Sequence, residues 1–254
     1  MRAGIIVLLL AGLLSSGCAA HQDQAAKAAS REEATVLSLD DDDRYLEEGF
    51  ESQVIPDPIE YWNRGMFVLN DGLITVIGRP VNAVYTTVLP EGMRDGVGNF
   101  FTNLLFPVRF VNNLLQGNGH RASQEFGRFI INTSAGLGGF FDVASTNPDV
   151  QNMVDADFGM TLGKWGMGEG FYLYWPLLGP SNARDTVGFA GDFFLDPLTY
   201  VRPWQVSLPI SSLRVVNPLD EMLDLYDEVS KSAIDPYTAI RDGYTQFRRA
   251  KIAK

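Results

Sequence analysis

Glycine and proline divide the apolar segments of this 254-residue chain into short pieces, and this limits the folds open to it. From Asp57 onward, apolar residues recur at steps of three and four, the spacing of one face of an α-helix. The runs cover residues 59–77, 100–106, 108–115, 122–133 and 182–195. Strict alternation of apolar and polar residues is scarce. The pattern therefore predicts an all-α fold of short helices and does not support a β-barrel.

Two further helices are expected at the end of the chain, within residues 215–254. Asn217 and Pro218 have the character of a helix cap and first turn, and Asp235 with Pro236 begins the second helix. Basic residues finish that helix, where the helix dipole favours positive charge. These two helices are richer in charged residues than the rest of the folded body, so we expect them to face water.

The first seventeen residues match a secretory signal. A single Arg is followed by an apolar stretch of eleven residues, 4–14, whereas a bilayer span needs roughly 20. Small residues then lead to Cys18, the only cysteine of the chain, as in a bacterial lipoprotein signal. Ser15 stands where such signals usually have Leu, which keeps an ordinary secretory signal as the alternative. We predict that Cys18 is lipidated and that Ala19, which is not Asp, favours sorting to the outer membrane.

Residues 18–56 are expected to form the lipid anchor and an acidic, flexible tether. Residues 19–60 hold 12 acidic and 3 basic side chains, so most of the net charge of −11 belongs to this segment. The run Asp40–Asp43 lacks the spaced ligands and central glycine of a calcium loop. A solvated tether is therefore the better interpretation. The negative charge of the whole chain also argues against nucleic acid as a partner.

Residues 57–214 have an unusual composition for a water-exposed body. Residues 61–214 contain nine Arg, one Lys, all four Trp and 20 of the 25 Gly of the chain. Two stretches, 132–141 and 170–183, contain no charged residue. Each is either buried core or partly immersed in lipid, with short helices and aromatic rings near the interface. The scarcity of Lys and the concentration of Trp favour lipid contact.

The sequence lacks the patterns of common catalytic sites. It has no G-x-S-x-G motif for a hydrolase nucleophile, and residues 159–165 do not match a phosphate-binding loop. One Cys and two His make a metal site improbable. Asp155 and Asp157 lie close enough to act as an acid–base pair, but a loop cap is the simpler interpretation. We therefore expect neither an enzyme nor a cofactor.

A series of short motifs, in fixed order, carries a resemblance to a known family. They are DPIEYWNR at 57–64, RPV at 79–81, LQG at 115–117, RFIINT at 128–133, GGFFDVA at 138–144, FG and TLG at 158–163, WG with a further Gly at 165–168, PL and GP at 176–180, and DPY at 235–237. In this order they resemble the VacJ/MlaA family of outer-membrane lipoproteins, over about residues 55–252.

The resemblance implies an all-helical, ring-like body partly embedded in the outer membrane beside a trimeric porin. It implies a central amphipathic channel that passes mislocalised glycerophospholipids from the outer leaflet toward a periplasmic phospholipid-binding shuttle protein, without covalent chemistry. The anchored protein would face the periplasm, with residues 215–254 on that side. The alternative is a structural, porin-associated envelope lipoprotein that transfers no lipid.

Candidate site residues follow from what a lipid path requires. Apolar walls would contact the tails, and an arginine fork suits the phosphate. We expect lipid-tail contacts from Phe140, Phe141, Tyr172, Leu173, Tyr174 and Trp175, and head-group contacts from Arg109, Arg128 and Lys164. A packed aromatic ring or an ion pair is the alternative for each. Gly138 and Gly139 are either the hinge of a gating loop or a plain tight turn.

The lipid anchor leads to a direct test. Cells that express the protein in the presence of labelled palmitate should incorporate label into the wild type and not into Cys18→Ser. Equal labelling of the two proteins would contradict the anchor.

Overall fold

The computed structural model describes residues 54–151 and 155–253, and the structural statements below refer to these residues. The chain divides into two units, residues 1–54 and 55–254, of which the second holds nearly all the described residues. The predicted signal, Cys18 and the acidic tether up to residue 53 lie outside the described residues.

The all-α prediction is confirmed, with one small addition. A two-stranded antiparallel hairpin, which pairs Tyr172 with Asn182 and Trp175 with Gly179, occupies the uncharged stretch at 170–183. The elements in chain order are α2 (Glu60–Leu73), a π-helical stretch (Ile74–Gly78), α3 (Arg79–Val88), α4 (Glu91–Leu104), α5 (Phe106–Leu115), α6 (Gly119–Ser134), a 3₁₀ turn (Val143–Thr146), α7 (Phe158–Lys164), β1 (Tyr172–Trp175), β2 (Gly179–Asn182), α8 (Ala183–Leu195), a 3₁₀ turn (Pro197–Tyr200), α9 (Trp204–Val216), α10 (Leu219–Ser232) and α11 (Pro236–Ala253).

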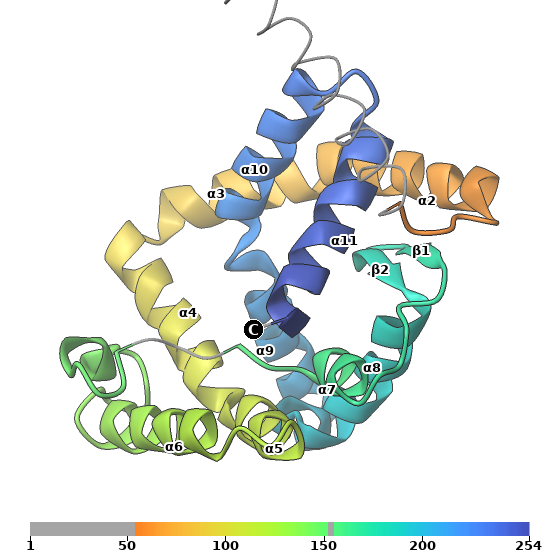
Figure 1. The fold of residues 1–254 in the computed structure, drawn as a ribbon. Coiled ribbons are helices and arrows are strands. Elements are labelled where there is room, and N and C mark those ends of the chain that lie inside the picture. Colours follow the sequence, from red (N-terminus) through yellow and green to blue (C-terminus); the bar gives the residue numbers. More distant parts are fainter. Residues whose placement is uncertain (1–53, 152–154, 254) are drawn as a thin grey trace, which may run out of the picture. The chain divides into compact units, whose positions relative to one another are not determined.

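Within the second unit, the packed elements form a closed circuit (Figure 1). The chain runs from α2 and α3 into α4, then α5 packs on α6, α7 and α8, and the hairpin leads from α8 back to α2. Helix α10 packs on α3, and α11 packs on α7 and β2, so this pair links opposite parts of the circuit. Helix α9 contacts α3.

The helix boundaries follow from local chemistry. Pro90 separates α3 from α4, and Pro107 lies in the first turn of α5, where its missing N–H costs nothing. The Asp157 carboxylate accepts a hydrogen bond from the Met160 amide and so caps α7 (2.7 Å). The Asn182 side chain caps α8 in the same way, from the Asp185 amide (2.7 Å). Asp157 is thus a helix cap, as the simpler interpretation of the sequence expected.

Two asparagines of α2 hold the hairpin in place. Buried Asn63 accepts a hydrogen bond from the Tyr174 amide (2.9 Å) and donates one to the Tyr172 carbonyl (3.1 Å). Asn70, two turns further along the helix, bonds the Trp175 carbonyl and the Leu177 amide in the same way. The two side chains thus act as a substitute strand for the free edge of β1, whose backbone groups need partners when buried.

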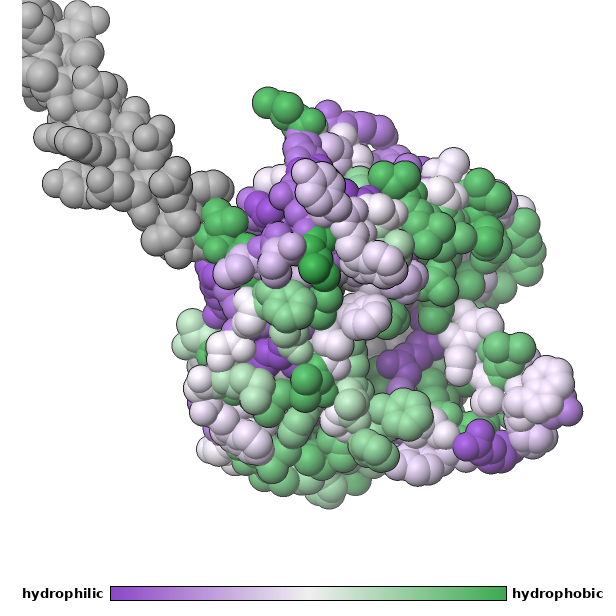
Figure 2. All heavy atoms as spheres, turned by 90° about the vertical axis from the view of Figure 1, so that its right-hand side faces the viewer, coloured by the Kyte–Doolittle hydropathy of each residue, from purple (hydrophilic) through white to green (hydrophobic). Residues whose placement is uncertain are grey.

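The distribution of polarity is partly inverted relative to a water-soluble domain. Buried side chains include eight asparagines and several ion-paired residues, among them Glu125 with no exposed surface. Large apolar side chains are exposed on many helices, including Phe193, Phe194, Trp204 and Leu208 on α8 and α9. Figure 2 shows broad apolar areas at the surface of one face, with polar residues between them. Buried polar groups and large exposed apolar areas are the informative departures from the usual pattern.

A compact apolar cluster joins the two ends of the part of the chain that the structure describes. Ile55, Tyr172, Tyr174 and Tyr237 pack together, so the body begins at least two residues before the predicted boundary at 57. Among residues 54–151 and 155–253, no helix has the length and apolar character needed to cross a bilayer.

Candidate functional site: an apolar cavity between α4 and α9

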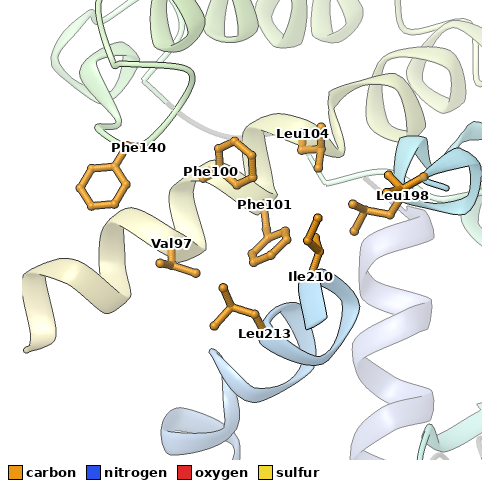
Figure 3. Close-up of a pocket in the computed structure, with 9 residues that line it drawn as sticks. Val97, Phe100, Phe101, Leu104, Phe140, Leu198, Ile210 and Leu213 are labelled. Atoms are coloured by element: carbon orange, nitrogen blue, oxygen red, sulfur yellow. The ribbon is translucent and has the colours of Figure 1, made fainter. Parts of the chain in front are cut away.

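A cavity of about 360 Å³ lies between α4 and α9 (Figure 3). Its lining side chains are all apolar: Val97, Phe100, Phe101 and Leu104 of α4, Ile210 and Leu213 of α9, and Phe140, Leu198 and Val201 from connecting segments. The spacing of the α4 residues places them on one helix face. A space with such a lining offers no partner to water, so it suits a hydrocarbon.

Phe140 reaches the cavity because residue 96 is glycine. A Cβ atom at position 96 would lie 2.1 Å from Cζ of Phe140, so the ring rests directly on the backbone of α4. Phe141 packs edge-on against Phe140, with ring centroids 5.1 Å apart, and remains 53% exposed. Of the two predicted tail contacts in this segment, the structure thus places Phe140 in the cavity wall and Phe141 at the surface.

Gly138 and Gly139 form a tight turn that ends α6. Both have positive φ angles, and their amides donate hydrogen bonds to the Thr133 and Asn132 carbonyls. A Cβ atom on Gly139 would lie 2.4 Å from Cβ of Asn103, whereas Gly138 has open space around it. The Asn103 amide group also donates to the Gly138 carbonyl (3.3 Å). The contacts favour the tight-turn interpretation over a free hinge, and they set the position of Phe140.

The two predicted head-group arginines are both in ion pairs. Arg109 donates to Glu125 (2.7 Å), and both side chains are buried. Arg128 binds both oxygens of Asp142 and also the carbonyls of residues 150 and 151. Breaking such a buried pair to bind a phosphate would leave a carboxylate without a partner at high cost. In this structure, Arg109 and Arg128 therefore tie α6 to its neighbours and are not available to a ligand.

The remaining predicted residues divide by exposure. Tyr172 and Tyr174 are buried in the apolar cluster. Burial disfavours the charged phenolate, so it raises the pKa of both side chains. Leu173 is half-buried, and Trp175 is 38% exposed with its indole N–H bonded to Thr186. In this arrangement Tyr172 and Tyr174 stabilise the fold and are not accessible to lipid. None of the four residues lines the α4–α9 cavity.

A network of charged groups fastens the end of α11. Arg248 binds Asp157 (2.6 Å) and Asp185 (2.8 Å). Burial raises the pKa of the Asp185 carboxyl, but the hydrogen bond and charge of Arg248, with further hydrogen bonds from Tyr244 and Arg184, hold it below its usual range. Lys251 pairs with Asp155. Asp155 and Asp157, the two candidates for an acid–base pair, thus bind separate cations of α11. Burial, with the nearby charge of Asp157, raises the pKa of Asp192 to about 6.

Comparison with known proteins decides the family. The family model described as "MlaA lipoprotein" matches residues 55–251, nearly the whole described body. The chain belongs to the MlaA lipoprotein family. This confirms the resemblance carried by the sequence motifs, and the start of the match at residue 55 agrees with the position of Ile55 in the core.

Relatives of similar length support the assignment. The chain is 35% identical over 200 residues to the intermembrane phospholipid transport system lipoprotein MlaA of Escherichia coli, covering 78% of this chain and 79% of that protein. It is 31% identical over 202 residues to the MlaA lipoprotein of Haemophilus influenzae, with coverage of 77% and 79%. An uncharacterized protein of Rickettsia bellii is 34% identical over 224 residues, with coverage of 85% and 86%.

A solved structure shares the fold. It is described as "Structural basis for maintenance of bacterial outer membrane lipid asymmetry" and matches with a TM-score of 0.68 and 32% sequence identity. The match covers 77% of this chain and 98% of that chain.

The sequence patterns did not reveal α9 or the cavity that it helps to form. Residues 204–216 include Pro209 and are apolar on several sides, so they show little helical periodicity. Nothing local in the sequence shows that the ring of Phe140 rests on Gly96. The available signal was the low charge of residues 204–216, in which Arg214 is the only charged side chain.

The turn at 138–139 leads to a matched pair of substitutions. Gly138→Ala should lower the free energy of unfolding by about 1–2 kcal/mol, the cost of a positive φ angle for a residue with a side chain. Gly139→Ala should lower it further, because its Cβ also collides with Asn103. Denaturant unfolding of the detergent-solubilised protein measures both. A Gly139→Ala protein as stable as the wild type would show that the segment moves freely, as a hinge would.

Proposed function

We propose that this chain is an outer-membrane lipoprotein that takes mislocalised glycerophospholipids from the outer leaflet and passes them toward a periplasmic lipid carrier. Membership of the MlaA lipoprotein family supports the proposal, because named relatives belong to an intermembrane phospholipid transport system. The observation that carries it is the wholly apolar cavity between α4 and α9. Such a space lowers the cost of moving a hydrocarbon tail away from the bilayer.

The exposed apolar helices support a position within one leaflet of the membrane. Phe193 and Phe194 end α8, and Trp204 and Leu208 lie on α9, with exposures between 58% and 69%. Short helices with aromatic residues at one level are typical of proteins that lie in the interfacial region. A lipidated Cys18 would add a second attachment, which makes anchoring stable.

The polar helices suit the water-facing side of the same body. Helix α10 begins with Asp220 and Glu221, and Asp227 pairs with Arg79 and Lys231. We assign α10 and α11 to the periplasmic side, where the lipid carrier would dock, and we expect the trimeric porin beside the apolar surface. This assignment keeps the boundary at residue 215 that the sequence suggested, although α9 continues to Val216.

Deletion and complementation in the native host test the proposal. Loss of the gene should raise the phospholipid that an added phospholipase reaches on intact cells, because strayed lipid is no longer removed from the outer leaflet. Expression of the wild-type chain should return it to the parental level. Normal surface phospholipid in the deletion strain would contradict the proposal.

The same strains separate two other functions. A structural porin-associated lipoprotein would co-purify with porin while its deletion leaves the lipid distribution unchanged. A phospholipase would release fatty acid when the purified protein is incubated with phospholipid vesicles, whereas a transport component should leave each lipid chemically intact.

A further inference from the structure

We propose that the α4–α9 cavity holds a single acyl chain and that Arg202, at its edge, binds the phosphate of the same lipid. The inference rests on the proposed lipid-transfer function and adds a site to it. Three observations support it. They are the size and lining of the cavity, the absence of an acidic partner for Arg202, and the pairing of the nearby acid Asp196 with Arg214.

The cavity matches one hydrocarbon chain in chemistry and in scale. Its nine lining residues present no charged or amide side chain, so a polar head group finds no partner inside. Its volume of about 360 Å³ lies near the lower end of the roughly 300–1,000 Å³ typical of small-molecule sites. One tail is therefore a better occupant than a whole two-chain phospholipid. Figure 3 shows Phe101 and Ile210 directed toward one another from the two helices.

Almost every cation of the described body already has an acidic partner. Arg64, Arg79, Arg94, Arg109, Arg128, Arg184, Arg214, Arg241, Arg248, Arg249, Lys231 and Lys251 all form ion pairs. Arg202 and Lys164 are exposed, and neither has an ion pair with any carboxylate of residues 54–151 and 155–253. These two cations can bind an anion without breaking an existing pair.

Position in the chain distinguishes the two. Arg202 directly follows Val201, which lines the cavity, and precedes the start of α9 at Trp204. Lys164 ends α7, and no residue of α7 lines the cavity. Trp204 is 65% exposed, and an indole beside a cation is typical of the level where lipid head groups meet water. By its place in the chain, directly after a lining residue, Arg202 is therefore the better candidate of the two for a phosphate whose tail occupies the cavity.

The acid nearest in sequence to this edge is already engaged. Asp196 pairs with Arg214 (2.5 Å), whose neighbour Leu213 lines the cavity, and it also accepts a hydrogen bond from the Leu198 amide (2.9 Å). Residues 196–216 contain Arg202, Arg214 and Asp196 as their only charged side chains, so their net charge is +1. That balance is complementary to a monoanionic phosphodiester.

Photolabelling of the full-length lipoprotein in vesicles tests the site. The vesicles contain phosphatidylglycerol with a photoreactive group near the end of one acyl chain, and peptide mass spectrometry locates the label. We expect label within residues 97–104 and 210–213. Arg202→Glu should lower this labelling roughly fivefold, the upper effect of an exposed ion pair. Lys164→Glu makes the same charge change at the other unpaired cation and should leave labelling unchanged.

A second variant tests the cavity itself. Val97→Trp fills the space from α4, so it should abolish label on 210–213 while circular dichroism shows an unchanged helix content. Label spread evenly over the exposed apolar helices would overturn the proposal. So would an equal loss in Lys164→Glu, or unchanged labelling in Val97→Trp.

The two proposals fail separately. Normal surface phospholipid in the deletion strain refutes lipid transfer, whatever the labelling shows. Full complementation by a wild-type protein that carries no label on α4 and α9 refutes this site and leaves the transfer function standing.

Discussion

The structure depends on satisfying a polar interior. Asn63 and Asn70 complete the hydrogen bonds of the hairpin edge, and the Arg109–Glu125 pair joins α5 to α6 at sites with little or no exposure. Because hydrogen bonds and ion pairs fix the inner faces of the helices, their apolar side chains are left to point outward. Such an arrangement is costly in water, and it becomes favourable when lipid covers the outer faces.

The same constraint determines which residues remain for a ligand. The ion pairs that hold the helices together use nearly all the cations of the described body, so positive charge is a poor guide to a phosphate site unless its partners are known. The apolar cavity is also a product of packing, since it depends on a glycine that admits Phe140 and on a turn that positions it. The proposed tail site and the proposed head-group site thus have different origins within one fold.

The sequence predicted the helical class and the family well, because periodicity and short motifs are local properties. A cap, the simpler of the two interpretations of Asp157, agrees with its place at the start of α7, since a cap is decided within one turn of helix. The sequence did not predict that Tyr172 lies buried in a hairpin or that Arg128 is held by Asp142, because both depend on partners distant or unmarked in sequence. The sequence marked Phe140 as a candidate for tail contact, which stays a prediction, and its contact with Gly96 is visible only in three dimensions.

The central claim is that lipid covers the exposed apolar side chains of the folded body. The accessibility of spin labels in vesicles tests it most directly. Phe194, Leu208 and Met222 are 69%, 58% and 59% exposed, so they offer similar labelling sites on α8, α9 and α10. If lipid covers the apolar surface, labels at 194 and 208 should collide more often with oxygen than with a water-soluble nickel complex, and a label at 222 should show the reverse. Preferential collision with the nickel complex at all three positions would contradict the account.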